Sequence, residues 1–221
     1  MNDARSERRI AQDLLNIGAV TFSLDEPFKW ASGLRSPIYC DNRLTIGYPT
    51  VRRRIRDAFV EHLRRDDRHP DLIAGTATAG IPHAAWLAES LDLPMIYVRS
   101  KPKEHGKGSR IEGPITSGQR VVVIEDLIST GGSSIGVVEA LRREDLDVIA
   151  VLAIFSYELR EAETAFASLE MPLITLTNFN CLFEVARMAG MLDDREIESI
   201  SSWCSNPRRW TEDCLAREER L

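Results

Sequence analysis

The clearest feature of the hydrophobic pattern is an unbroken apolar run, VVVI, at 121–124. A short run of this kind is typical of a strand that is buried on both faces of a parallel sheet. Comparable apolar runs predict further strands at 71–75, 94–99, 148–155 and 173–176. In the segments between them apolar residues recur at helical spacing. This pattern predicts helices after residue 80, at 133–143 and 159–169, and one or two helices over 179–204.

Strands that alternate with helices indicate an α/β fold with a mostly parallel sheet flanked by helices. In such sheets ligands bind at the carboxyl ends of the strands, near the point where the strand order reverses. Two turns rich in small residues, at 75–80 and 125–133, follow predicted strands. We therefore expect these two turns to line one crevice.

The first part of the chain follows another pattern. Apolar positions predict a helix at 5–17, a short strand at 19–24 and a helix at 49–65, while 28–43 combines glycine, proline and alternating apolar residues. We interpret residues 1–45 as a segment too short to be an independent domain but long enough to fold over something. The whole chain, 1–221, is then a single domain.

Composition narrows the function. Of the 221 residues 43% are apolar, which is enough for a core, and the net charge of −6 argues against general nucleic-acid binding. The basic run Arg52–Arg54, with Arg56, lies on the predicted helix 49–65, so we interpret it as a solvated helix face and not a nucleic-acid patch. Four scattered cysteines without CxxC spacing are expected to be reduced thiols.

The charged first residues, MNDARSERR, lack the apolar stretch of a signal peptide. The chain also lacks a run that approaches the roughly 20 apolar residues needed to cross a bilayer. We therefore expect a cytoplasmic protein that does not bind membranes.

The chemistry is concentrated after the strand at 121–124. Two carboxylates, Glu125 and Asp126, are followed by the small hydroxyl residues Ser129 and Thr130 and by a glycine pair. A glycine-rich turn that leads into a helix N-terminus suits a phosphate, because backbone N–H groups approach it closely and the helix dipole favours negative charge. Adjacent carboxylates beside that turn suit vicinal hydroxyls, so the pattern predicts a sugar phosphate as ligand.

Residues 100–119 form a second unusual segment, a long polar stretch with four glycines and two prolines. Such a loop inside a compact domain is usually functional or disordered. Its basic residues, with Arg99 just before it, are Lys101, Lys103, His105, Lys107 and Arg110. Cations that close over a departing diphosphate would stabilise its developing charge. A diphosphate leaving group would therefore explain why this acidic chain contains a basic loop.

These motifs carry a family resemblance. Residues 121–133 resemble the phosphoribosyl-pyrophosphate signature of type I phosphoribosyltransferases, and RSKPKEHG at 99–106 resembles the flexible catalytic loop of orotate phosphoribosyltransferases. Residues 30–43 resemble the hood that these enzymes fold over the pyrimidine, and 75–88 resemble their second conserved turn. The resemblance implies transfer of a phosphoribosyl group from phosphoribosyl pyrophosphate to orotate, which forms orotidine monophosphate and diphosphate.

The resemblance also implies roles for residues. Lys103, His105 and Asp126 would be catalytic, and Ser129 would contact orotate. Magnesium would be held through the substrate, with no protein ligand assigned, and a homodimer would share the catalytic loop between subunits. The residues that would bind phosphoribosyl pyrophosphate are Arg99, Lys103, His105, Glu125, Asp126, Leu127, Ile128, Ser129, Thr130, Gly131, Gly132 and Ser133.

The sequence departs from some members of that family. Ala31 stands where some have a lysine before the Ser-Gly of the hood, and Tyr157 lies near the place where some hold the substrate carboxylate with an arginine. Arg35 or Arg43 could take over that task. Two alternatives stay open from the sequence: a purine or uracil phosphoribosyltransferase, and a non-catalytic regulatory protein with the same fold.

Overall fold

The computed structural model describes residues 2–30, 33–101 and 110–218. A six-stranded sheet in the order β10-β9-β8-β5-β6-β7 forms its centre. Five of these strands run parallel, and β7 pairs antiparallel to β6 at the edge. The bounds are β5 (Leu72–Thr76), β6 (Met95–Val98), β7 (Ile111–Glu112), β8 (Arg120–Ile128), β9 (Asp147–Ser156) and β10 (Leu173–Asn178). This confirms the predicted α/β class.

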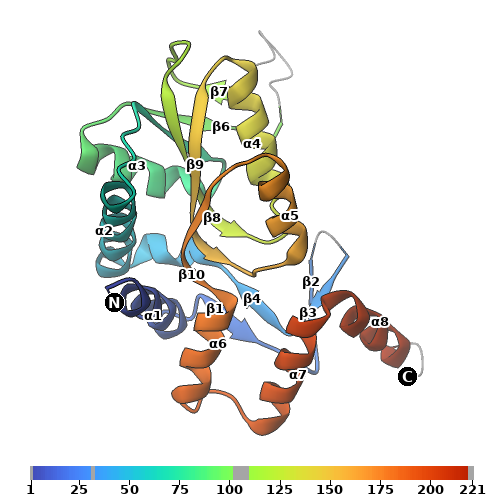
Figure 1. Ribbon diagram of the computed structural model, residues 1–221. Helices are drawn as coiled ribbons and strands as arrows, with labels where there is room; N and C mark the ends of the chain where they lie inside the picture. Colours follow the sequence, from blue (N-terminus) through green and yellow to red (C-terminus); the bar gives the residue numbers. More distant parts are fainter. Residues whose placement is uncertain (1, 31–32, 102–109, 219–221) are drawn as a thin grey trace.

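Helices cover both faces of the sheet (Figure 1). Helices α1 (Asn2–Asn16), α2 (Pro49–Arg65) and α3 (Gly80–Leu91) cover one face, and α4 (Gly132–Arg143) and α5 (Arg160–Ser168) cover the other. Because side chains alternate along a strand, β8 sends Val122 and Ile124 into the first core and Val121 and Val123 into the second. Burial on both faces explains the uninterrupted apolar run.

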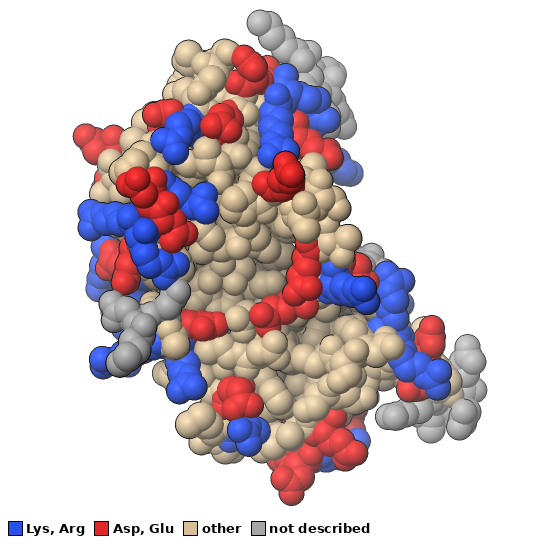
Figure 2. Space-filling view, viewed as in Figure 1, with Lys and Arg blue, Asp and Glu red and all other residues tan. Residues whose placement is uncertain are grey.

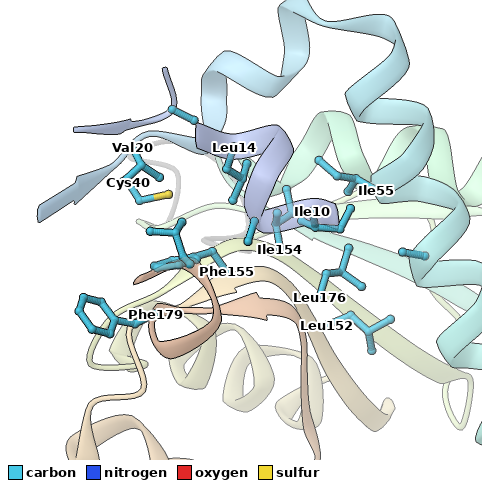
Figure 3. Packing of buried hydrophobic residues seen from close by; sticks show 14 of the residues in the cluster. Ile10, Leu14, Val20, Cys40, Ile55, Leu152, Ile154, Phe155, Leu176 and Phe179 are labelled. Carbon is cyan, nitrogen blue, oxygen red and sulfur yellow. The ribbon is translucent and has the colours of Figure 1, made fainter. Parts of the chain in front are cut away.

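Figure 3 shows part of the first core. Ile10 and Leu14 of α1 lie over Ile154 and Leu176 of the sheet, and all four side chains are buried. Helix α1 therefore packs directly on the sheet, and only the later part of the segment 1–45 is free to cover a site. We use the name hood for residues 20–47, from β1 to the end of the 3₁₀ turn that precedes α2.

The hood consists of two small antiparallel pairs and a 3₁₀ turn. Strand β1 (Val20–Phe22) pairs with β4 (Ile38–Cys40), and β2 (Phe28–Lys29) pairs with β3 (Arg35–Ser36). The 3₁₀ turn η1 (Asn42–Gly47) then leads into α2.

The chain ends in three helices, α6 (Phe179–Met188), α7 (Asp194–Ser205) and α8 (Pro207–Glu218). The sequence predicted one or two helices up to residue 204 and left α8 unassigned. A capping box separates α7 from α6: the Asp193 side chain accepts from the Glu196 N–H, and the Glu196 side chain accepts from the Asp193 N–H.

Three local predictions need correction. The acidic pair lies within β8 and not after it, because pairing with β9 continues through Glu125 to Ile128. The segment 100–119 contains strand β7, whose Ile111 packs against the second core. The arginines of α2 are not simply solvated: Arg54 pairs with Asp13 of α1, and the Arg52 guanidinium lies 4.7 Å from the Trp86 ring centroid.

Candidate active site

A cavity of about 750 Å³ opens at the carboxyl ends of β5, β8 and β9. Both predicted turns reach it, through residues 77–79 and 125–133, so the expected crevice is confirmed. The hood closes the other side. The described residues that line the cavity are Lys29, Trp30, Tyr39, Cys40, Asp41, Arg43, Ala77, Thr78, Ala79, Glu125, Asp126, Leu127, Ser129, Thr130, Ser133 and Tyr157.

The two carboxylates of β8, which we call the acidic doublet, are placed differently. Glu125 is 5% exposed, and its two oxygens accept from the Ser134 hydroxyl at 3.0 Å and from the Asp126 N–H at 3.1 Å. Asp126 is half-buried, and its backbone carbonyl accepts from the Asn42 side-chain amide at 2.6 Å. Both carboxylates line the cavity, but α4 holds Glu125 through Ser134.

Burial governs the protonation of the doublet. It raises the pKa of Glu125 well above its ordinary value, and the neighbouring Asp126 charge raises it further. Burial also raises the pKa of Asp126. Two adjacent carboxylates in one partly enclosed site do not ionise easily together, so the doublet is prepared for a ligand that donates hydrogen bonds or brings positive charge.

The phosphate corner follows the doublet. Gly131 adopts φ +82°, and a Cβ on it would lie 3.1 Å from the Phe166 ring, so another residue would be strained there. Helix α4 starts at Gly132, and no described side chain caps its N-terminus. Its first N–H groups are therefore available to an anion. Ser129, Thr130 and Ser133 surround the corner with hydroxyl groups.

A close backbone contact fixes the second turn against the doublet. A Cβ on Gly80, the first residue of α3, would lie 2.4 Å from the Ile124 carbonyl oxygen and 3.4 Å from the Glu125 Cα. Only glycine permits this approach. This contact therefore holds the start of α3 rigidly against the part of β8 that leads into the doublet.

Aromatic residues form the wall between sheet and hood. Trp30 lies 4.5 Å from Tyr157, measured between ring centroids, and Phe155 packs at 88° to the Tyr157 ring. The Cys40 N–H donates to the Tyr157 hydroxyl at 2.9 Å, and burial raises the pKa of that hydroxyl. Tyr157 thus remains a neutral phenol that joins β9 to the hood.

The hood is also held at its 3₁₀ turn and by the C-terminal helices. Thr45 Oγ1 lies 3.1 Å from His83 Nε2, and burial lowers the pKa of His83 to about 4, so this contact involves a neutral imidazole. The backbone of Arg35 donates to the Thr211 hydroxyl at 3.0 Å, and its carbonyl accepts from the Trp203 indole at 2.9 Å. No local pattern in the sequence indicates these long-range contacts.

The other predicted site residues fall into four groups. Leu127, Ser129, Thr130 and Ser133 line the cavity, whereas the Ile128 side chain is buried in the second core. Arg99 pairs with Glu112 at 3.7 Å and does not line the described part of the cavity. Lys103 and His105 lie outside the described residues.

Sequence reasoning did not assign cavity roles to Lys29, Trp30, Tyr39, Cys40, Asp41, Asn42 and Tyr157. For the six residues before Tyr157 the only signal is the mixed apolar and polar pattern of 28–43, beside its resemblance to a hood. For Tyr157 the only signal is that some family members carry an arginine near this position. Among the described residues, no group of three or more His, Cys, Asp or Glu side chains is arranged to hold a metal. The described helices include none that is long and apolar enough to cross a membrane. Basic and acidic side chains are interspersed over the described face in Figure 2.

Known proteins share this architecture. A family model described as phosphoribosyl transferase domain matches residues 48–174. The orotate phosphoribosyltransferase of Listeria monocytogenes is 52% identical over 204 residues, which are 92% of this chain and 98% of the relative. The orotate phosphoribosyltransferase of Bacillus caldolyticus is 55% identical over 201 residues, 91% of this chain and 97% of the relative.

Solved structures agree with this similarity. Orotate phosphoribosyltransferase from Aeropyrum pernix has a TM-score of 0.72 and 30% identity, with 83% of this chain and 99% of that chain covered. Leishmania donovani UMP synthase has a TM-score of 0.78 and 26% identity, with 90% of this chain but 42% of the longer protein covered.

Proposed function

Because the chain belongs to the phosphoribosyl transferase domain family, and within it to the orotate phosphoribosyltransferases of pyrimidine (UMP) biosynthesis, we propose that its cavity is the transferase site. There the phosphoribosyl group of phosphoribosyl pyrophosphate passes to orotate, and diphosphate leaves. This membership argues against a non-catalytic regulatory protein and favours orotate over a purine or uracil as the acceptor. The observation that carries the proposal is that the acidic doublet, the phosphate corner and the aromatic hood meet in one cavity.

The phosphate corner anchors the sugar. The N–H groups at the start of α4 and the hydroxyls of Ser129, Thr130 and Ser133 suit the 5′-phosphate. Asp126 accepts hydrogen bonds from the ribose hydroxyls, and Glu125 supports it from the more buried position. These contacts fix the anomeric carbon, so that its positive charge develops in a position set by the protein.

The pyrimidine occupies the hood side of the cavity. Trp30, Tyr39 and Tyr157 provide aromatic surface for a flat ring, and Ser129 lies at the border between ring and sugar. Orotate itself attacks the anomeric carbon, so the reaction requires no protein nucleophile. The protein's part is to align the two substrates and to exclude water between them.

The cations of the loop act on the leaving group. Following the family resemblance, Lys103, His105 and Arg99 neutralise the diphosphate, and one such preorganised contact contributes about 3 kcal/mol in the transition state. The Arg99–Glu112 pair would then open when the diphosphate binds.

The donor set of the cavity also fits magnesium. Asp126, Glu125 and Asp41 offer carboxylate oxygens, which Mg²⁺ prefers, and the described residues form no cage of their own for it. The ion would therefore be held mainly by substrate oxygens, with the doublet nearby. When bound, it would neutralise charge on the ribose and diphosphate oxygens.

A homodimer that shares the catalytic loop belongs to the same proposal. Leu44 in η1 of the hood and Tyr48 directly after it are 42% and 45% exposed. Exposed apolar side chains of this size suit a second copy of the chain. If the loop crosses between subunits, mixing the inactive Lys103→Ala and Asp126→Asn proteins restores activity, whereas loops that serve their own subunit leave the mixture inactive.

The direct test of the activity is spectroscopic. The protein is mixed with orotate, phosphoribosyl pyrophosphate and magnesium, and the loss of orotate absorbance is followed, with uracil and hypoxanthine in parallel reactions. We expect turnover of orotate alone. Faster consumption of uracil or hypoxanthine, or no consumption of any base by folded protein, would contradict the proposal.

A further inference from the structure

Two of the described residues that line the cavity carry a positive charge, Lys29 and Arg43. The Arg43 guanidinium is engaged by Asp41 through two hydrogen bonds of 2.6 and 2.7 Å. The pair is ionised, because the Arg43 side chain holds the pKa of Asp41 below its usual range. Arg43 therefore adds no net positive charge to the cavity.

Lys29 has a different environment. It is the last residue of β2, directly before Trp30, and its side chain reaches the cavity from the hood side. Within the described residues it forms no ion pair or side-chain hydrogen bond. Of the two cations among the described residues that line the cavity, Lys29 is thus the one that no acidic side chain neutralises.

Arg35 is the other hood cation that the sequence suggested for the substrate carboxylate, and its position excludes it from that role. It does not line the cavity, and its backbone is fixed to Thr211 and Trp203 of the C-terminal helices. The structure therefore disfavours both cations that the sequence suggested, Arg35 and Arg43, and adds Lys29, which the sequence did not suggest.

The ligand's charge requires such a group. Orotate is a pyrimidine with a carboxylate. The charge of Asp41 is balanced by Arg43, but the two carboxyl groups of the acidic doublet also line the cavity and disfavour any further negative charge beside them. A like charge next to them would be repelled, so the substrate carboxylate needs a cation away from the doublet. Lys29, on the hood side of the cavity and one residue before Trp30, supplies such a cation.

On this basis, which rests on the proposed function, we infer that Lys29 binds the carboxylate of orotate and so distinguishes orotate from uracil. Lys29 is then a specificity residue that binds substrate and does not act on the bond that breaks. Its loss weakens orotate binding in the ground state and the transition state equally, so it raises KM and leaves kcat nearly unchanged.

The experiment compares Lys29→Met, which keeps an unbranched side chain only one atom shorter and without the charge, with Lys29→Arg, which keeps the charge. Arg195→Gln, which removes a surface cation paired with Asp25, is the matched charge control. We expect Lys29→Met to raise the KM for orotate about ten- to a hundredfold, the range for a hydrogen bond to a charged group. Lys29→Arg restores most of this loss, and Arg195→Gln shows none.

A neutral probe makes the test specific. The carboxamide of orotate, used as a competitive inhibitor, has no negative charge, so we expect its inhibition constant to be the same for the unsubstituted protein and Lys29→Met. Thermal melting of each variant shows that the fold is intact, which is expected because Lys29 is exposed.

The outcomes separate this inference from the proposed function. An unchanged KM for orotate in folded Lys29→Met overturns the inference, as does a rise confined to the KM for phosphoribosyl pyrophosphate, which would assign Lys29 to the diphosphate. In both cases the unsubstituted protein still consumes orotate, so the proposed function stands. If the unsubstituted protein does not consume orotate, the proposed function itself fails.

Discussion

The two sides of the cavity are built in opposite ways. The sheet side consists of the acidic doublet and the corner at 129–133, which end a strand buried on both faces and contact α3 and α4. The hood side consists of strands of two or three residues that are held by a few buried side chains, such as Ile38, and by hydrogen bonds to distant parts of the chain. The sheet side is thus suited to chemistry that needs fixed geometry, and the hood side to recognition of the base.

The largest effect is expected on the sheet side. Asp126→Asn keeps the shape of the side chain but removes the charge that we propose binds the ribose hydroxyls, so kcat should fall by about a hundredfold or more. The melting temperature should stay close to that of the unsubstituted protein, because no described side chain of the fold depends on this carboxylate for an ion pair. Steady-state kinetics and thermal melting test this prediction. Normal turnover with a much lower melting temperature would make the doublet structural.

A glycine substitution tests whether the sheet side is rigid. Gly80→Ala places a methyl group 2.4 Å from the Ile124 carbonyl oxygen, so backbone must move next to the doublet. We expect a loss of about 1–3 kcal/mol in the free energy of unfolding and a lower kcat. Gly47→Ala is the matched control, because a Cβ there meets nothing within 4 Å. Urea unfolding that gives equal stabilities for both variants would show that the contact can relax.

A smaller effect is expected where the C-terminal helices support the hood. Thr211→Val removes the hydroxyl that accepts from the Arg35 N–H, at a cost of about 1 kcal/mol in the free energy of unfolding. The KM for orotate should rise severalfold with little change in kcat, because we propose that the hood binds the base. Thr164→Val, an exposed position on α5, provides the control. A fall in kcat without a change in KM would contradict the division between the two sides.

The smallest effect concerns pH. The raised pKa of Glu125 means that the folded protein keeps a proton that the unfolded chain releases above about pH 4.3. The folded state binds more protons in that window, so this residue lowers stability as pH rises through it. Glu125→Gln removes the effect. The measurement is the melting temperature of the variant minus that of the unsubstituted protein. We expect this difference to increase from pH 4 to pH 7. A difference that stays constant would show that burial does not raise the pKa of Glu125.

These contrasts also explain what the sequence could predict. The run 121–124, the doublet and the glycine pair lie within one short stretch, and local pattern fixes their geometry, so the sheet side was recognisable. The extension of β8 through Ile128 was not, because it depends on pairing with β9. The hood depends on contacts such as Cys40 with Tyr157 and Arg35 with Thr211, which are 117 and 176 residues apart. Periodicity carries no information about such pairs.

The most direct test of the account is a crystal structure of the protein soaked with phosphoribosyl pyrophosphate and orotate. We expect the 5′-phosphate at residues 129–133, the ribose hydroxyls within hydrogen-bond distance of Asp126, and the pyrimidine beside Trp30 and Tyr157. A sugar bound away from this cavity, or an Asp126 side chain turned away from a sugar bound within it, would contradict the account.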